Sequence, residues 1–192
     1  MAKRFSEVLR GTQCTVRPWR TSDAGSVVAY ANNIKIARQL RDRFPHPYTL
    51  ENARNFLASV SGRDSDGSNL AIEVDGEAIG AVGFVAGEDI ERYSAEIGYW
   101  LGEPFWGRGI ATEAVMLVTA DLFVRVNMLR LFALPFADNA ASARVLEKAG
   151  YLREALLRSS SVKYGVARDQ FLYARVNDRW RQPQPAENQR AS

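Results

Sequence analysis

The sequence has a single cysteine, Cys14, and a single histidine, His46, among its 192 residues. One cysteine cannot form an intramolecular disulfide bond, which fits a reducing compartment. The usual zinc sites bring several His and Cys ligands together, so we expect no metal centre. Lysine is also scarce, with four residues, so arginine supplies most of the positive charge.

No apolar run reaches the length of about 20 residues that a transmembrane helix requires. Residues 1–11 also lack the apolar centre of a signal peptide. We therefore expect a cytoplasmic protein without a membrane partner. The formal net charge of +3 and the isoelectric point of about 9.2 are mildly basic. Because the basic residues are scattered rather than clustered, nucleic-acid binding ranks last among the functional hypotheses, and we expect no direct contact with it.

The composition that remains is typical of a soluble globular protein, with 46% hydrophobic and 24% charged residues. A chain of 192 residues is long enough to bury the core of one domain. We expect this domain to span residues 1–181. Residues 182–192 are polar and contain two prolines, so we expect a disordered tail there.

Short apolar and alternating segments bounded by turn residues predict seven strands. They lie at residues 12–18, 69–74, 77–85, 93–101, 129–134, 151–157 and 169–176. Helical spacing and capping residues predict helices that begin near Ser22 or Asp23 and at Thr49, and others at residues 110–126 and 139–149. Residues 34–43 are helical or irregular, and residues 62–68 and 159–168 are expected loops. This order predicts an α/β (α+β) sandwich with a mixed sheet.

The segment with the most informative chemistry is residues 96–114, EIGYWLGEPFWGRGIATEA. Its Gly107-Arg108-Gly109 loop joins a strand to a helix, and two glycines there permit a tight turn without obstructing side chains. The first N–H groups of a helix have no internal partner and suit a phosphate. A bare Gly-x-Gly is weak support, since a tight turn with a glycine-assisted helix cap is the better explanation of the loop taken alone. No Walker A or complete Rossmann pattern follows.

In its longer context, the segment resembles the central motif of the GNAT superfamily of N-acetyltransferases, Gln/Arg-x-x-Gly-x-Gly/Ala after a strand. Gly109 and Ala111 match this motif, whereas Trp106 stands where Gln or Arg is usual. That departure is common in the branch similar to ribosomal-protein N-acetyltransferases of the RimJ/RimL type. Residues 139–151, with Asn139, Ser142 and the sequence VLEKAGY, match the N-x-x-S…LEKAG[FY] pattern of the same branch.

The resemblance covers roughly residues 11–180 and implies a mostly antiparallel central sheet of about seven strands flanked by helices. It also implies acetyl-CoA as the acyl donor. The pantetheine arm would lie along Tyr99, Trp100 and Leu101, with Asn139 contacting it and Ser142 near the sulfur. The pyrophosphate would bind the amides of the loop and helix start, at Trp106, Gly107, Arg108, Gly109, Ile110, Ala111 and Thr112.

Two side chains are candidates for the chemistry of such a transfer. Glu96 is the candidate general base, acting through a water molecule, and its alternative is a solvated carboxylate on a strand. Ser142 is the candidate partner of the departing thiolate, and its alternative is a small serine that packs between helices. Tyr151 or water is the alternative proton donor to the sulfur. A main-chain amide near residues 97–99 would hold the oxyanion.

The implied acceptor is a primary amine, most favourably the N-terminal α-amine of a protein. With a pKa of about 8 rather than about 10.4, an α-amine is neutral roughly 200 times more often than a lysine amine. A small-molecule amine (a polyamine, antibiotic or amino acid) and a non-catalytic acyl-CoA-binding module are the alternatives. Arg43, Phe44, His46, Tyr48 and Tyr164 are candidates to line the acceptor site. An exposed strand edge or the final hairpin could support a homodimer.

Overall fold

The computed structural model describes residues 8–61 and 68–182 of the chain. The loop predicted at residues 62–68 and the disordered tail predicted at residues 182–192 lie almost wholly outside the described residues. Within the described part of the chain, no helix is both long and apolar enough to cross a membrane.

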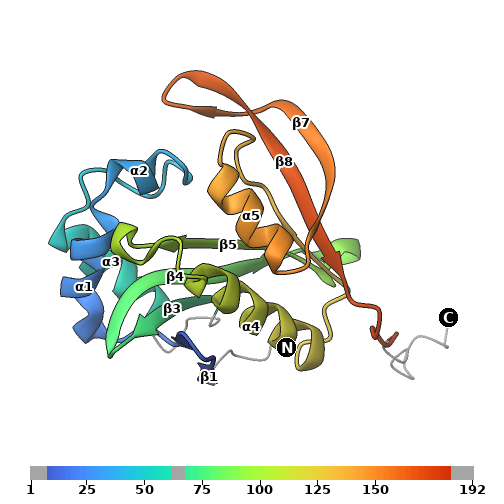
Figure 1. Cartoon of the computed structure of the whole chain (residues 1–192), viewed down its shortest axis with the longest axis horizontal. Coiled ribbons are helices and arrows are strands. Elements are labelled where there is room, and N and C mark those ends of the chain that lie inside the picture. Colours follow the sequence, from blue (N-terminus) through green and yellow to red (C-terminus); the bar gives the residue numbers. More distant parts are fainter. Residues whose placement is uncertain (1–7, 62–67, 183–192) are drawn as a thin grey trace, which may run out of the picture.

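The described strands form one sheet, with helices packed against it (Figure 1). They are β1 (Leu9–Arg10), β2 (Thr15–Arg17), β3 (Asn69–Val74), β4 (Glu77–Ala86), β5 (Ser94–Leu101), β6 (Arg130–Ala133), β7 (Leu152–Lys163) and β8 (Val166–Val176). The spatial order is β1-β2-β3-β4-β5-β6-β8-β7. Only the pair of β5 and β6 is parallel, so the sheet is mixed and mostly antiparallel, as predicted.

The described helices are η1 (Thr21–Asp23), α1 (Ala24–Ala31), α2 (Ile34–Ala37), α3 (Leu50–Ser61), η2 (Asp89–Glu91), η3 (Glu103–Phe105), α4 (Ile110–Val124) and α5 (Ala140–Lys148). The two longest agree with the prediction to within about two residues at each end. Asp23 stands at the N-cap position of α1, but its side chain makes no capping hydrogen bond to this helix. Its carboxylate instead accepts hydrogen bonds from two nitrogens of the buried Arg17 guanidinium, each at 2.8 Å. The start of α1 is therefore held to β2 by an ion pair.

The two faces of the sheet carry separate hydrophobic cores. Leu70 and Ile72 pack in the core beneath α4 and α5, whereas Ala71 between them packs in the core beneath α1 and α3. Successive side chains of a strand point to opposite faces, so this alternation is expected for a sheet covered on both sides. The same alternation on β5 directs Ile97 toward α4 and Trp100 toward α3. The strand β5 thus contributes side chains to both sides of the molecule.

Two parts of the sheet differ from the sequence prediction. The eighth strand arises because Leu9 and Arg10 pair with β2 at the sheet edge. The loop predicted at residues 159–168 is wrong, since β7 and β8 continue through it to a two-residue turn at Tyr164-Gly165. Both turn residues have positive φ, +52° and +77°, as a tight hairpin turn requires. The hairpin extends beyond α5 in Figure 1 and is largely exposed, so burial imposes little alternation on its sequence.

Candidate active site

The edge of β5 opens where this strand leaves β6. The two strands pair only through Ser94, Ala95 and Glu96, although β5 continues beside β4 to Leu101. Residues 97–101 therefore have no strand partner on this edge among the described residues. An unpaired strand edge presents N–H and C=O groups to which an extended molecule can bond.

The ladder with β4 determines which main-chain groups face this open edge. The Gly102 N–H donates to the Ile79 carbonyl at 2.8 Å, and in antiparallel pairs such bonds recur at every second residue. Trp100 therefore bonds to β4 through its main chain, whereas the N–H and C=O of Tyr99 point away from β4. Of residues 97–99, where the sequence predicts an oxyanion donor, Ile97 and Tyr99 have N–H groups that point away from β4 by this alternation. Trp100 directs its side chain to the opposite face.

Trp106 has a defined contact at the end of this edge. Its indole Nε1 donates to the Leu101 carbonyl at 2.7 Å. This bond ties the loop after β5 to the last residue of the strand, and the ring remains 44% exposed. The tryptophan that replaces the usual Gln or Arg therefore has a structural role in holding the loop.

The loop itself has the geometry of an anion site. Gly107 and Gly109 both have positive φ, +75° and +83°, which non-glycine residues rarely adopt. Gly109 is the N-cap of α4, and as a glycine it offers no side chain to cap the helix. The first N–H groups of α4, at Ile110, Ala111 and Thr112, therefore have no acceptor within the helix. A Cβ at Gly107 would meet nothing within 4 Å, so the loop leaves room for a pyrophosphate.

Glu113, in the first turn of α4, was not anticipated from the sequence. Its carboxylate accepts hydrogen bonds from the main-chain N–H groups of Thr12, Gln13 and Cys14 at 2.8–2.9 Å. Burial by itself would raise the pKa of Glu113, but these bonds and that of the Thr12 hydroxyl outweigh it and lower the pKa to about 2. We call these hydrogen bonds between Glu113 and residues 12–14 the clamp. Beside it, the Gln13 side chain lies about 3.1 Å from the position that a Cβ on Gly109 would take.

The start of α5 meets the open edge of β5 through three side chains. The Asn139 side-chain oxygen accepts a hydrogen bond from the Ser142 N–H at 3.1 Å, as the predicted helix cap. The Tyr99 hydroxyl lies 2.7 Å from Ser142 Oγ and 3.1 Å from the Ser142 carbonyl oxygen. Burial raises the pKa of the Tyr99 phenol, so the side chain is a neutral donor. The sequence indicated Asn139 and Ser142, but not the Tyr99 side chain between them and β5.

Tyr151, the alternative proton donor, lies in the core beneath α4. It is 1% exposed, and its hydroxyl is 2.8 Å from the hydroxyl of Thr119 on that helix. Burial raises its pKa to about 12. These contacts describe a packed core tyrosine, whereas Ser142 and Tyr99 lie at the strand edge.

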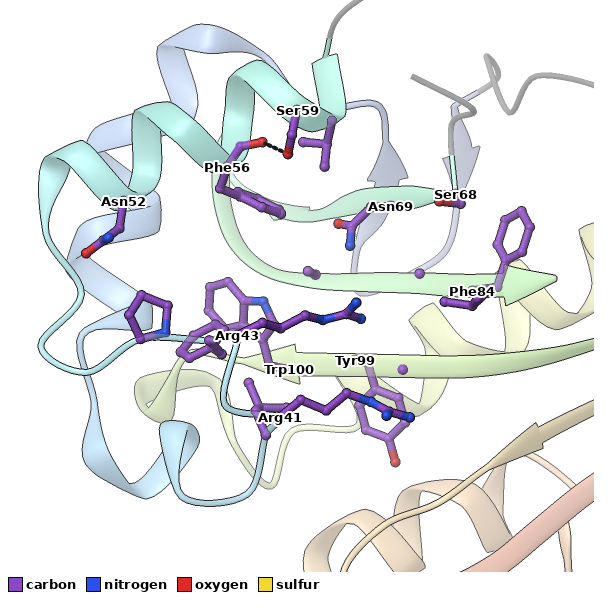
Figure 2. Close-up of a pocket in the computed structure, with 18 of the residues that line it drawn as sticks. Arg41, Arg43, Asn52, Phe56, Ser59, Ser68, Asn69, Phe84, Tyr99 and Trp100 are labelled. Carbon is purple, nitrogen blue, oxygen red and sulfur yellow. Dashed lines mark hydrogen bonds between the residues drawn. The ribbon is translucent and has the colours of Figure 1, made fainter. Parts of the chain in front are cut away.

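On the opposite face of the sheet, a cavity of about 790 Å³ lies between α3, the loop after α2 and strands β4 and β5 (Figure 2). Glu96 lines this cavity, and both of its carboxylate oxygens accept hydrogen bonds from Arg41, at 2.5 and 2.7 Å. Arg43, Phe44 and Tyr48, which the sequence offers as candidates for the acceptor site, are among the residues that line this cavity. His46 and Tyr164, predicted with them, are not among the residues that line it.

The two sides of the site meet at β5. Tyr99, beside Ser142, lines the cavity together with Glu96 and Trp100 of the same strand. A group bound at the loop before α4 and extended along the open edge would therefore reach the cavity at the point where β5 and β6 separate. The arrangement suits a two-substrate reaction, with a phosphate-bearing substrate on one face of the sheet and a second substrate on the other.

Comparison with known proteins identifies the family. The Acetyltransferase (GNAT) domain family matches residues 13–152. The N-acetyltransferase YoaA of Bacillus subtilis is 29% identical over 182 residues, covering 90% of this chain and 98% of that protein. The ribosomal-protein-serine acetyltransferase of Escherichia coli is 32% identical over 103 residues, covering 53% of this chain and 56% of that protein.

Solved structures share the fold. RimJ of Mycobacterium smegmatis, in complex with CoA-disulfide, superposes with a TM-score of 0.80 at 23% identity and covers 93% of this chain and 91% of its own. RimL, a ribosomal L7/L12 α-N-protein acetyltransferase in complex with coenzyme A, has a TM-score of 0.78 at 24% identity and covers 90% and 99%. The family match spans well over half of the sequence, and the chain therefore belongs to the GNAT family of N-acetyltransferases, which use acetyl-CoA as the acyl donor.

Proposed function

We propose that the acceptor of this N-acetyltransferase is the N-terminal α-amine of a protein. The observation that carries the proposal is the position of Glu96 in a cavity of about 790 Å³ that lies across β5 from the acyl-donor side. A polypeptide end fits a cavity with both aromatic and polar walls, such as this one, which includes Phe44, Phe56 and Asn69.

Acetyl-CoA supplies the activated thioester carbonyl, and the residues of this chain fit it in three places. The N–H groups at the start of α4 suit the pyrophosphate, and the open edge of β5 suits the amides of the pantetheine arm. Asn139 and Ser142 lie where that edge meets α5. A Cβ at Gly107 would meet nothing within 4 Å, so this part of the loop leaves room for the pyrophosphate.

The chain's own groups support the transfer at the acetyl carbon. As the new C–N bond forms and the C–S bond breaks, the Tyr99 N–H can donate to the developing oxyanion. The amine proton leaves toward Glu96 through water, and the departing thiolate accepts a hydrogen bond from Ser142 Oγ. Because Arg41 occupies both Glu96 oxygens, an incoming amine must share or displace that guanidinium to reach the carboxylate.

Two further arguments favour an α-amine over a lysine amine. An α-amine has a pKa of about 8 and is neutral far more often at neutral pH, which reduces the demand on a carboxylate base. The relatives named as ribosomal-protein acetyltransferases act, by those names, on proteins. The cavity of this chain is consistent with the same class of acceptor.

The proposal is tested by thiol release from acetyl-CoA with two peptides of equal length. One has a free N-terminus and no lysine, and the other has a blocked N-terminus and one lysine. We expect turnover with the first to exceed that with the second, and to fall in Glu96→Gln but not in Glu51→Gln, an exposed change on α3 outside the cavity. Coenzyme A binding without thiol release across peptides, polyamines and aminoglycosides would instead favour a non-catalytic binding module.

A further inference from the structure

The charges of the acceptor cavity restrict which amines it can take. Its described lining contains two guanidinium groups, Arg41 and Arg43, and one carboxylate, Glu96. The remaining described residues of the lining are neutral or apolar. The cavity therefore has an excess of positive charge before a protonated amine enters, which is the opposite of what a polycationic substrate requires.

The two arginines have different partners. Arg41 is bound to both oxygens of Glu96. Arg43 makes no ion pair or side-chain hydrogen bond with any part of the chain that the structure describes. Figure 2 shows both side chains extending into the cavity from the loop between α2 and α3. Arg43 is thus the cation of this wall that is available to a ligand.

A neutral side chain of the same cavity adds hydrogen-bond donors. Asn69 Oδ1 accepts from Trp19 Nε1 at 2.9 Å. Because this oxygen is engaged, the Asn69 amide presents its NH₂ group as a donor. Asn69 Nδ2 lies 3.2 Å from the position of a Cβ on Gly83, in the cavity wall. A guanidinium together with amide donors is a set that recognises an anion.

We propose that Arg43, with the amide of Asn69, binds a carboxylate of the acceptor, so that the enzyme acetylates amines that carry an acidic group close by. The proposal rests on the acetyl transfer described above and specifies its substrate class. A peptide whose first few residues include Asp or Glu meets the requirement, and the α-carboxylate of a free amino acid is the second source of the same chemistry. Polyamines and aminoglycosides, which carry only positive charge, are excluded by it.

The test compares C-terminally amidated peptides that differ only at the second residue, which is Asp, Asn or Lys, and free glutamate as a separate acceptor. We expect kcat/KM to follow the order Asp, Asn, Lys. Loss of a hydrogen-bonded charge pair corresponds to about a 10- to 100-fold loss of binding, so Arg43→Gln should lower kcat/KM for the Asp peptide by that factor. The same variant should lower kcat/KM for the Asn peptide much less than for the Asp peptide, and Arg43→Lys should retain part of the preference.

Arg54→Gln is the matched control, since Arg54 is an exposed residue of α3 outside the cavity lining. It should leave the preference for Asp intact. A second readout, calorimetric binding of the Asp peptide to the coenzyme-A-loaded enzyme, should weaken with added salt and in Arg43→Gln. If free glutamate reacts better than the Asp peptide, the carboxylate is that of an amino acid, which still supports the role of Arg43.

Equal rates for the Asp, Asn and Lys peptides, or equal losses for all three in Arg43→Gln, would overturn the charge assignment while leaving acetyl transfer in place. Thiol release from none of the acceptors, despite coenzyme A binding, would contradict the proposed function itself. The two failures are therefore distinguishable in one set of measurements.

Discussion

Replacement of Gly109 by alanine should weaken coenzyme A binding through the backbone of the loop. Gly109 has a φ of +83° as the N-cap of α4, and an added Cβ would lie 3.1 Å from Gln13 Nε2, the movable end of a side chain. The strain therefore comes mainly from the left-handed backbone, which costs about 1–2 kcal/mol with a side chain present. If relaxation of that strain removes one N–H bond to the pyrophosphate, the loss is about 1.5–3 kcal/mol, or about 10- to 150-fold in Kd.

Gly76→Ala provides the matched control. Gly76 has nearly the same φ, +85°, and a Cβ there would meet nothing within 4 Å, but it lies in the turn between β3 and β4. Both variants should lower Tm by about 2–8 °C, and only Gly109→Ala should weaken coenzyme A binding. Titration calorimetry and thermal unfolding on the same samples measure the two effects. Equal Kd values in Gly109→Ala and Gly76→Ala would refute the assignment of this loop to the pyrophosphate.

Other changes test the remaining contacts. Tyr99→Phe removes the hydroxyl that lies 2.7 Å from Ser142 Oγ, so kcat should fall by about 2- to 12-fold with little change in the Kd of coenzyme A. In Ser142→Ala, kcat should fall at least as far. Unchanged kcat in both variants would show that neither side chain takes part in the chemistry. Glu113, whose pKa is lowered to about 2, contributes stability that is fully present above its unfolded pKa of about 4.3 and is lost as the pH falls toward 2. The difference in urea midpoint between wild type and Glu113→Gln should therefore shrink from pH 6 to about pH 3; a difference that grows on acidification would contradict the clamp.

Much of the geometry of the loop before α4 and of the start of α5 could be predicted because its pattern is local. Gly107 and Gly109 stand between a strand and a helix, and glycine at a positive φ is a requirement that one segment of sequence can reveal. Asn139 at the start of α5 is likewise a local capping signal, and the structure places its oxygen on the Ser142 N–H. The family pattern then ties both segments to acetyl transfer.

The contacts that sequence could not reveal join residues far apart in the chain. Arg41 and Glu96 are 55 residues apart, and Tyr99 and Ser142 are 43 apart. Such pairs depend on how β5 is placed against the loop after α2 and against α5, which no local pattern encodes. The bonds of Glu113 to residues 12–14 also span about 100 residues of sequence. From the sequence alone, a carboxylate in the first turn of a helix is explained by the helix dipole, so nothing indicates these bonds.

The sequence predicts a shorter hairpin than β7 and β8 form, and the reason is different. Its outer half is largely exposed and rich in serine, so neither alternation nor apolar content marks it as strand. It is nevertheless held to the rest of the fold, because Lys163 forms an ion pair with Asp42 at 2.7 Å and Arg168 donates to the Arg38 carbonyl at 3.1 Å. These contacts connect the hairpin to the loop that carries Arg41 and Arg43.

The most direct test of the proposed reaction is to locate the transferred acetyl group. Acetyl-CoA is incubated with the enzyme and a peptide that has both a free N-terminus and an internal lysine, and the product is fragmented in a mass spectrometer. We predict one acetyl group on the N-terminal nitrogen, with much less product in Glu96→Gln. Acetylation of the lysine Nζ alone, or no acetylated product while coenzyme A binds, would contradict the assignment of the acceptor.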